Sequence, residues 1–175
     1  MLGKTLPHIA REKAGIIKPN TPILIGEYHA DTLPVFEIIA EQRNAQIYTA
    51  FDSVSESDIL HTIPYQQHNE RTVRKACEIL QAQGVCITYD HMQQGIQSFI
   101  NTPILQGRWQ VLQKSPLVIC DVAHNEAGIQ YAMQSLKQYQ PTKLYIVVGF
   151  LKKKDVRHLL SFFPVDAYYL SLIHI

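Results

Sequence analysis

A charged residue on the apolar side of a predicted helix is the first feature with catalytic potential. The helix is predicted from Thr5 to Ala14, and residues three, four and seven apart stack on one side of it. Lys13 therefore shares one face of the helix with the apolar residues Leu6, Ile9 and Ala10. Removal from water favours the neutral amine of a lysine, which reacts with CO2 to form a carbamate able to ligate a metal. In the alternative interpretation the aliphatic stem of Lys13 covers the core and its ammonium reaches water.

The stretch LVICDVAHNEAG, residues 117–128, is the second candidate. A hydrophobic strand is predicted to end at Asp121 shortly before a helix begins, and ligands bind at such strand ends in open α/β sheets. Asp121 is suited to accept hydrogen bonds from ribose hydroxyls, and His124 to meet a charged substrate. The alternative assigns Asn125 or Asp121 to helix capping and leaves His124 on the surface. The spacing leaves both interpretations open.

Two further residues have a functional and a structural interpretation. Arg108, in QGRWQVL, stands at a predicted domain junction, where a forked guanidinium suits phosphate, although a solvated linker residue is the simpler interpretation. Asn69 is explained by capping of a predicted helix without any ligand. The basic run of residues 152–154 is interpreted as a solvated loop before Asp155, a helix cap.

The hydrophobic pattern predicts alternating strands and helices in both halves of the chain, which is typical of a parallel α/β sheet. The strands are predicted over residues 22–26, 46–50, 109–112, 117–121, 144–150 and 166–170. The helices are predicted over residues 5–14, 31–42, 70–83, 90–100, 126–138 and 155–162. Asp31 and Asn69 are predicted to cap the second and third helices.

The third predicted helix has an apolar face of Val73, Cys77 and Leu80, and residues 51–67 before it are predicted to be irregular. The Pro- and Gly-containing stretch 101–107 indicates a domain boundary. We place this boundary after residue 103, which separates domains 1–103 and 104–175.

Composition excludes several classes of protein. Sixteen Lys and Arg oppose fifteen Asp and Glu without long blocks of either sign, which argues against nucleic acid or an anionic membrane as partner. Apolar runs are short and the N-terminal stretch is unlike a signal peptide, so a cytoplasmic protein is expected. The three cysteines are odd in number and far apart, which indicates reduced, buried thiols.

The triplet Gly3–Thr5 spells the end of a phosphate-binding loop. Such a loop needs an upstream strand and an earlier glycine, and only Met1 and Leu2 precede the triplet. The triplet alone is therefore not interpreted as a nucleotide site.

Four stretches occur in an order that resembles the folylpolyglutamate synthase and dihydrofolate synthase family, within the Mur-type ATP-dependent amide ligases. They are LGKTLPHIAREKAGIIKP, YQQHN, QGRWQVL and CDVAHN. The resemblance runs from about Leu2 to Tyr169 and assigns Gly3–Thr5 to the family pattern LGxTL. It implies an α/β fold, with the end of a P-loop ATPase domain of the Mur ligase central type followed by the first half of a Rossmann-like C-terminal domain.

The resemblance implies an enzyme that uses ATP and Mg²⁺ to phosphorylate the terminal carboxylate of dihydropteroate or a folate. The amine of L-glutamate then attacks the acyl phosphate, giving an amide, ADP and phosphate. The expected partners are these small molecules, and the protein is expected to be a monomer. The alternatives are a cell-wall muropeptide ligase of the Mur type and a non-catalytic α/β binding module.

The resemblance also implies roles for single residues. Lys13 matches a catalytic lysine that is carbamylated and assists the magnesium site. Asn69, Arg108 and Asp121 match ATP-contacting positions. His124 matches a catalytic position near the incoming glutamate.

The sequence also departs from the family pattern. The phosphate loop and the other metal ligands are absent, so the chain is interpreted as an internal piece, poorly soluble and inactive alone. Glu126 stands where the family often has Pro, and Lys154 and Asp155 match a recurrent pair to which we assign no role. Residues 171–175 resemble nothing in the family, and a non-native origin is our interpretation of them.

Overall fold

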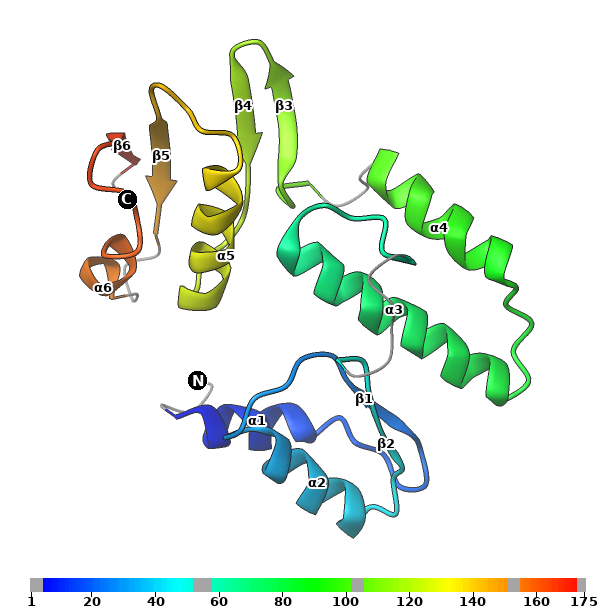
Figure 1. The fold of residues 1–175 in the computed structure, drawn as a ribbon. Helices are drawn as coiled ribbons and strands as arrows, with labels where there is room; N and C mark the ends of the chain where they lie inside the picture. The colour runs from blue at the N-terminus through cyan, green and yellow to red at the C-terminus, as the bar shows by residue number, and fades with distance from the viewer. Residues whose placement is uncertain (1–4, 52–57, 102–105, 151–154, 173–175) are drawn as a thin grey trace. The chain divides into compact units, whose positions relative to one another are not determined.

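The computed structural model describes residues 5–51, 58–101, 106–150 and 155–172 of the chain (Figure 1). The chain divides into unit 1, Met1–Ile100, and unit 2, Asn101–Ile175. The boundary predicted after residue 103 falls among residues 102–105, outside the described residues. The start of the Gly3–Thr5 triplet, the basic run 152–154 and residues 173–175 also lie outside them.

Unit 1 is an α/β unit in which one helix connects two parallel strands (Figure 1). Ile23 lies opposite Ile47, and Ile25 opposite Thr49, which confirms the predicted parallel pairing. The elements of unit 1 in chain order are α1 (Leu6–Ala14), β1 (Ile23–Ile25), α2 (Leu33–Gln42), β2 (Ile47–Thr49), α3 (Pro64–Ala82) and α4 (Tyr89–Asn101).

The ends of α1 are those predicted. The hydroxyl of Thr5 accepts a hydrogen bond from the backbone N–H of His8 at 3.5 Å, and Gly15 caps the other end. α1 packs on α2. The buried core here consists of Ala14, Ile17, Ala40 and Ala45, most of which are small residues. Short side chains at this contact allow the two backbones to approach closely.

The N-cap predicted for α2 is wrong by one residue. The cap is Thr32, and its side chain makes no capping hydrogen bond; the Thr32 hydroxyl instead donates to the carbonyl of His29 at 3.5 Å. Pro34 occupies the second helical position and has no N–H for a cap to bind. Asp31 is exposed, and its backbone N–H donates to Nδ1 of His29 at 3.1 Å.

α3 differs most from its prediction. It begins at Pro64, where a fixed φ suits the first helical position, so the end of the predicted irregular segment is helical. Its exposed residues include Val73 (48%) and Leu80 (40%), two residues of the predicted apolar face. Its two buried residues are instead Glu70 and Arg74.

Unit 2 combines an antiparallel hairpin with a parallel strand pair. Gln110 lies opposite Cys120 in the hairpin, whose pairing was not predicted, and Tyr145 lies opposite Tyr168 in the parallel pair. The elements are β3 (Gln110–Lys114), β4 (Leu117–Cys120), α5 (Glu126–Lys137), β5 (Tyr145–Gly149), α6 (Val156–Leu160) and β6 (Tyr168–Leu172). Both units therefore have the predicted α/β composition.

The cysteines are unpaired, as predicted, but not buried. Cys86 is exposed, and Cys77 and Cys120 are half-buried. Among the described residues, no helix combines the length and the apolar character that crossing a membrane requires.

Candidate functional site

Asp121 lies at the carboxyl end of β4 and joins two turns of unit 2. Its Oδ2 accepts a hydrogen bond from the backbone N–H of Trp109 at 2.9 Å, and its Oδ1 accepts one from the N–H of Ala123 at 2.8 Å. The carboxylate therefore fastens the turn that precedes β3 to the turn that follows β4. Because the side chain is only half-buried, it remains accessible beside these contacts.

Gly107 makes a second contact between the same two turns. Its carbonyl accepts a hydrogen bond from the N–H of Val122 at 2.8 Å. The φ of Gly107 is +71°, and an added Cβ would lie 2.4 Å from Cγ1 of Val122. Only glycine satisfies both the left-handed backbone and this close approach.

Trp109 anchors the other side of the turn. Its φ is +51°, which is uncommon outside glycine, and its side chain is buried at 8% exposure. The indole Nε1–H donates to the hydroxyl of Tyr139, which follows the C-terminal end of α5, at 3.3 Å. Arg108, between buried Gly107 and buried Trp109, is itself exposed, so the turn presents an always-charged guanidinium on a fixed backbone.

His124 follows Asp121 on the turn between β4 and α5. Its Nδ1 lies 3.1 Å from the carbonyl oxygen of Val122. A carbonyl only accepts, so Nδ1 carries the proton and, in the neutral ring, Nε2 is an acceptor. The imidazole is exposed, which leaves Nε2 accessible to a substrate.

Asn125 is the N-cap of α5. Its Oδ1 accepts a hydrogen bond from the N–H of Gly128 at 2.9 Å. The capping alternative is therefore right for Asn125 and wrong for Asp121, whose oxygens bind the two turns instead.

The first residue of α5 also contacts α6. Oε2 of Glu126 lies 3.1 Å from Nε2 of His158, and both side chains are more than half exposed. Asp155 caps α6 by accepting from the N–H of His158 at 3.1 Å, which confirms its predicted role. The N-terminal ends of the two helices are thus joined by one exposed pair.

Lys13 is exposed in this chain, which agrees with the interpretation in which its ammonium reaches water and not with burial of the amine. The buried residues of α1 are Ala10 and Ala14, and the next buried residue along the chain is Ile17. Ala10, Ala14 and Ile17 are four and three residues apart, so they lie on one side of the chain. Lys13 precedes Ala14, lies next to this buried side and is exposed. The described residues of this chain therefore do not withdraw its amine from water.

Asn69 lies in the second turn of α3, so the helix-capping interpretation is wrong. Its side chain is exposed. Thr72 lies one turn later on the same side of the helix and packs closely on Gly26. A Cβ added at Gly26 would lie 2.7 Å from the hydroxyl oxygen of Thr72. Gly26 directly follows β1, so this side of α3 lies at the carboxyl end of a parallel strand.

The structure brings together three of the five predicted site residues. Arg108, Asp121 and His124 lie on two hydrogen-bonded turns of unit 2. Lys13 and Asn69 lie on different helices of unit 1, α1 packing on α2 and α3 on β1. Among the described residues, no group of three or more His, Cys, Asp or Glu side chains is arranged to hold a metal ion.

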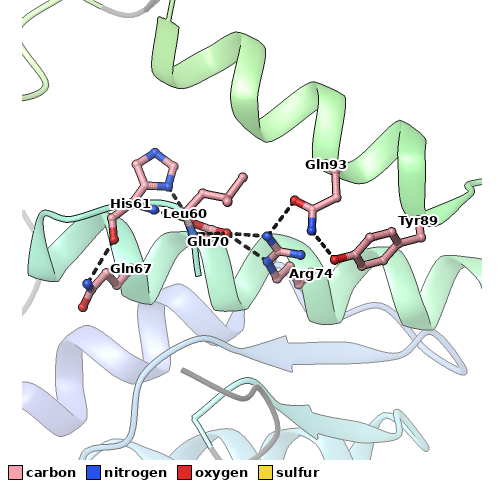
Figure 2. Close-up of polar contacts among 7 residues, drawn as sticks. All are labelled: Leu60, His61, Gln67, Glu70, Arg74, Tyr89 and Gln93. Carbon is pink, nitrogen blue, oxygen red and sulfur yellow. Dashed lines mark hydrogen bonds and ion pairs between the residues drawn. The ribbon is translucent and has the colours of Figure 1, made fainter. Parts of the chain in front are cut away.

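A buried carboxylate in α3 was missed by the sequence analysis (Figure 2). The side chain of Glu70 has no exposed surface. It accepts hydrogen bonds from the N–H groups of Leu60 and His61 at 3.0 Å, and its Oε2 lies 2.7 Å from Nδ1 of His61. Because a carboxylate only accepts, Nδ1 of His61 donates.

Arg74 completes this cluster from the next turn of α3. Its Nε and Nη2 donate to Oε1 of Glu70 at 2.9 and 2.6 Å, and Nη2 also donates to Gln93 of α4 at 3.2 Å (Figure 2). Burial raises the pKa of Glu70, but the hydrogen bonds from Leu60, His61 and Arg74 outweigh burial and lower it below its ordinary value of 4.5. The spacing of four residues between Glu70 and Arg74 was the available signal.

Comparison with known proteins gives matches over nearly the whole chain. Residues 107–171 match the family described as Mur ligase, glutamate ligase domain. The dihydrofolate synthase/folylpolyglutamate synthase of Escherichia coli (strain K12) is 29% identical over 96% of this chain and 42% of its own length. The protein of that name from Bacillus subtilis (strain 168) is 25% identical over 92% of this chain and 42% of its own length. The chain thus spans about two fifths of the length of these relatives.

Solved structures agree in fold. E. coli FolC in complex with DHPP and ADP has a TM-score of 0.73 and 27% identity, over 92% of this chain and 41% of its own. A bifunctional folylpolyglutamate synthase/dihydrofolate synthase with Mn, AMPPNP and L-glutamate bound has a TM-score of 0.70 and 25% identity, over 93% and 41%. An FPGS-AMPPCP-folate complex, at 22% identity, has a TM-score of 0.77 over 92% and 44%, and supports the fold alone.

Proposed function

We propose that this chain, a member of the folylpolyglutamate synthase/dihydrofolate synthase family, is an internal part of an ATP-dependent ligase. The ligase joins L-glutamate to dihydropteroate or to the γ-carboxylate of a folate. The observation that carries the proposal is the hydrogen bond from the N–H of Trp109 to Asp121. It holds the turn that contains Arg108 at the carboxyl end of β4, beside the Asp121 carboxylate and the turn of His124.

The residues of this turn suit a nucleotide. The exposed guanidinium of Arg108 offers a fork of donors to phosphate oxygens. The carboxylate of Asp121, which accepts the backbone N–H groups of Trp109 and Ala123, is a group suited to accept from a ribose hydroxyl. In unit 1, the exposed Asn69 has an amide that both donates and accepts, as recognition of a base edge requires. Magnesium, when bound, offsets the charge of the transferred phosphoryl group.

In the proposed reaction the γ-phosphoryl group passes from ATP to the acceptor carboxylate, which forms an acyl phosphate and ADP. The amine of glutamate attacks the acyl carbon, the bond from carbon to the phosphate oxygen breaks, and phosphate leaves. The amine must lose a proton in this step. Nε2 of His124 is an acceptor because Nδ1 donates to Val122, so we assign His124 to orient the amine and receive this proton.

Lys13 is assigned to the magnesium site as a carbamate, and this assignment rests on the family resemblance. Since Lys13 is exposed on α1 of this chain, the desolvation that stabilises the carbamate has to come from other parts of the ligase. We expect Lys13→Ala to lose most activity in the full-length enzyme and to regain part of it with a small added carboxylic acid. Arg11→Ala, on an exposed position of α1, is the control and should keep full activity.

The direct test measures ADP release by the full-length enzyme with ATP, Mg²⁺ and L-glutamate. Turnover with dihydropteroate or a tetrahydrofolate supports the proposal, and turnover with a nucleotide-linked muropeptide alone would replace it with a cell-wall ligase. Arg108→Ala and Asp121→Ala should each lower kcat/KM at least about a hundredfold, whereas exposed Arg157→Ala on α6 should not. Full turnover in all three variants would favour a non-catalytic module.

A monomeric, cytoplasmic enzyme completes the proposal, and size-exclusion chromatography tests the monomeric state.

A further inference from the structure

Glu70 fastens the segment that leads into α3 onto the second turn of that helix. The N–H groups of Leu60 and His61 and Nδ1 of His61 all bind its carboxylate. Gln67, three residues earlier on the same side of α3, donates from its Nε2 to the carbonyl of His61 at 3.0 Å (Figure 2). The start of α3 is therefore held by two of its own side chains, and Asn69 lies between them in the chain.

A different side of α3 lies against the strand pair. Thr72 packs on Gly26 at the carboxyl end of β1, and Asn69 shares the side of Thr72. The helix is thus held on one side by the segment ending at His61 and on another by β1. These two contacts together set the rotation of the second turn about the helix axis, and hence the direction of the Asn69 side chain.

The cluster also resists movement because it is buried and charged. The side chains of Glu70 and Arg74 have 0% and 4% of their surface exposed, and Arg74 extends the cluster to Gln93 of α4. Gln93 in turn donates to the hydroxyl of Tyr89. Loss of Glu70 removes the contacts with Leu60 and His61. It also leaves the buried charge of Arg74 without a partner, which is strongly unfavourable.

We propose that Glu70 is a positioning residue for nucleotide binding, which holds α3 so that the neighbouring Asn69 reaches the nucleotide. This inference rests on the proposed function, in which Asn69 contacts ATP. Glu70 itself touches no substrate, because its side chain is fully buried and its oxygens are engaged by Leu60, His61 and Arg74.

The test is a double-mutant cycle in the full-length enzyme, with Asn69→Ala, Glu70→Ala and the double variant. Asn69→Ala should raise KM for ATP about tenfold, as expected for one lost polar contact. Glu70→Ala should raise KM for ATP by a similar factor and leave KM for glutamate within about twofold. The double variant should bind ATP no more weakly than Asn69→Ala, because Glu70 acts through Asn69.

Glu78→Ala is the matched control. Glu78 is an exposed glutamate on the same helix, paired with Lys75 at 2.8 Å, and its loss should leave KM for ATP unchanged. If Glu70→Ala does not fold, Glu70→Gln replaces it in the cycle, since it keeps the volume and one acceptor oxygen. Glu70→Gln should show a smaller rise in KM for ATP with the same dependence on Asn69.

Two outcomes would overturn the inference separately from the proposed function. An equal rise in KM for every substrate, or multiplied effects in the double variant, would make Glu70 merely structural while Asn69 keeps its role. An unchanged KM for ATP in Asn69→Ala would remove the assignment of Asn69 and this inference with it. In both cases, turnover with dihydropteroate or folate would still support the ligase.

Discussion

Glu70 in unit 1 and Asp121 in unit 2 perform the same local task in different surroundings. Each carboxylate fastens a segment of chain by accepting two or more backbone hydrogen bonds. Glu70 is buried and its charge is balanced by Arg74, whereas Asp121 is half-buried beside the exposed Arg108. Burial, more than hydrogen bonding, therefore distinguishes a carboxylate that orders a helix from one that is accessible to a ligand.

Replacement of each carboxylate by alanine gives the largest expected contrast. Glu70→Ala should lower the free energy of unfolding by about 3–5 kcal/mol, because it leaves a buried guanidinium uncompensated. Asp121→Ala should cost about 1–2 kcal/mol, because its two freed N–H groups are closer to water. Urea denaturation of both variants measures the difference. Equal losses would mean that the burial of Glu70 does not distinguish the two sites.

Gly107→Ala tests whether the turn at Asp121 depends on its backbone geometry. The added Cβ meets Val122 at a backbone conformation that alanine avoids, so a loss of about 1–3 kcal/mol is expected, together with weaker nucleotide binding through Arg108. Gly95→Ala is the control, because an added Cβ in α4 meets nothing within 4 Å and should stabilise the helix by up to about 1 kcal/mol. Thermal denaturation with and without ATP separates the two effects.

The pH dependence of stability tests the contribution of the Glu70 carboxylate. Its pKa is lowered in the folded protein, so near and below pH 4.5 the unfolded chain binds more protons at this residue than the folded one. The contribution of Glu70 is therefore complete above about pH 4.5 and is lost as the pH falls through the lowered pKa. Unfolding midpoints measured from pH 7 to pH 3 should fall less steeply in Glu70→Gln than in the unaltered chain. Parallel curves would contradict the assignment.

Glu126→Pro has the smallest expected effect. Glu126 is the first residue of α5, where proline is well tolerated, and the extended backbone of Asn125 suits a residue before proline. The change removes two exposed contacts, the pair with His158 and the hydrogen bond from Nε2 of Gln130 at 3.4 Å, and exposed pairs of this kind are each worth less than about 1 kcal/mol. The unfolding midpoint should hardly move, and a large fall would show that the joined ends of α5 and α6 support the site of unit 2.

Local signals predicted most of the elements. Thr5 and Asn125 lie at the helix starts that their types indicate, and the order of strand, helix and strand predicted the parallel pair of unit 1. The start of α3 was missed because residues 51–67 lack a clear hydrophobic period. The strands β3 and β4 were predicted but their antiparallel pairing was not, because the alternation of strands and helices along the chain indicates parallel pairing.

For the candidate site, the residue types at the end of β4 and their nearness along the chain follow from the sequence. Three features depend on packing in three dimensions: Asp121 binds the turn of Arg108, Lys13 is exposed, and α3 buries Glu70 and Arg74. The physical reason is that periodicity tells which residues share a face of a helix. Only the packing of that helix against its neighbours decides which face leaves water, and a charged face leaves water when its partners balance it.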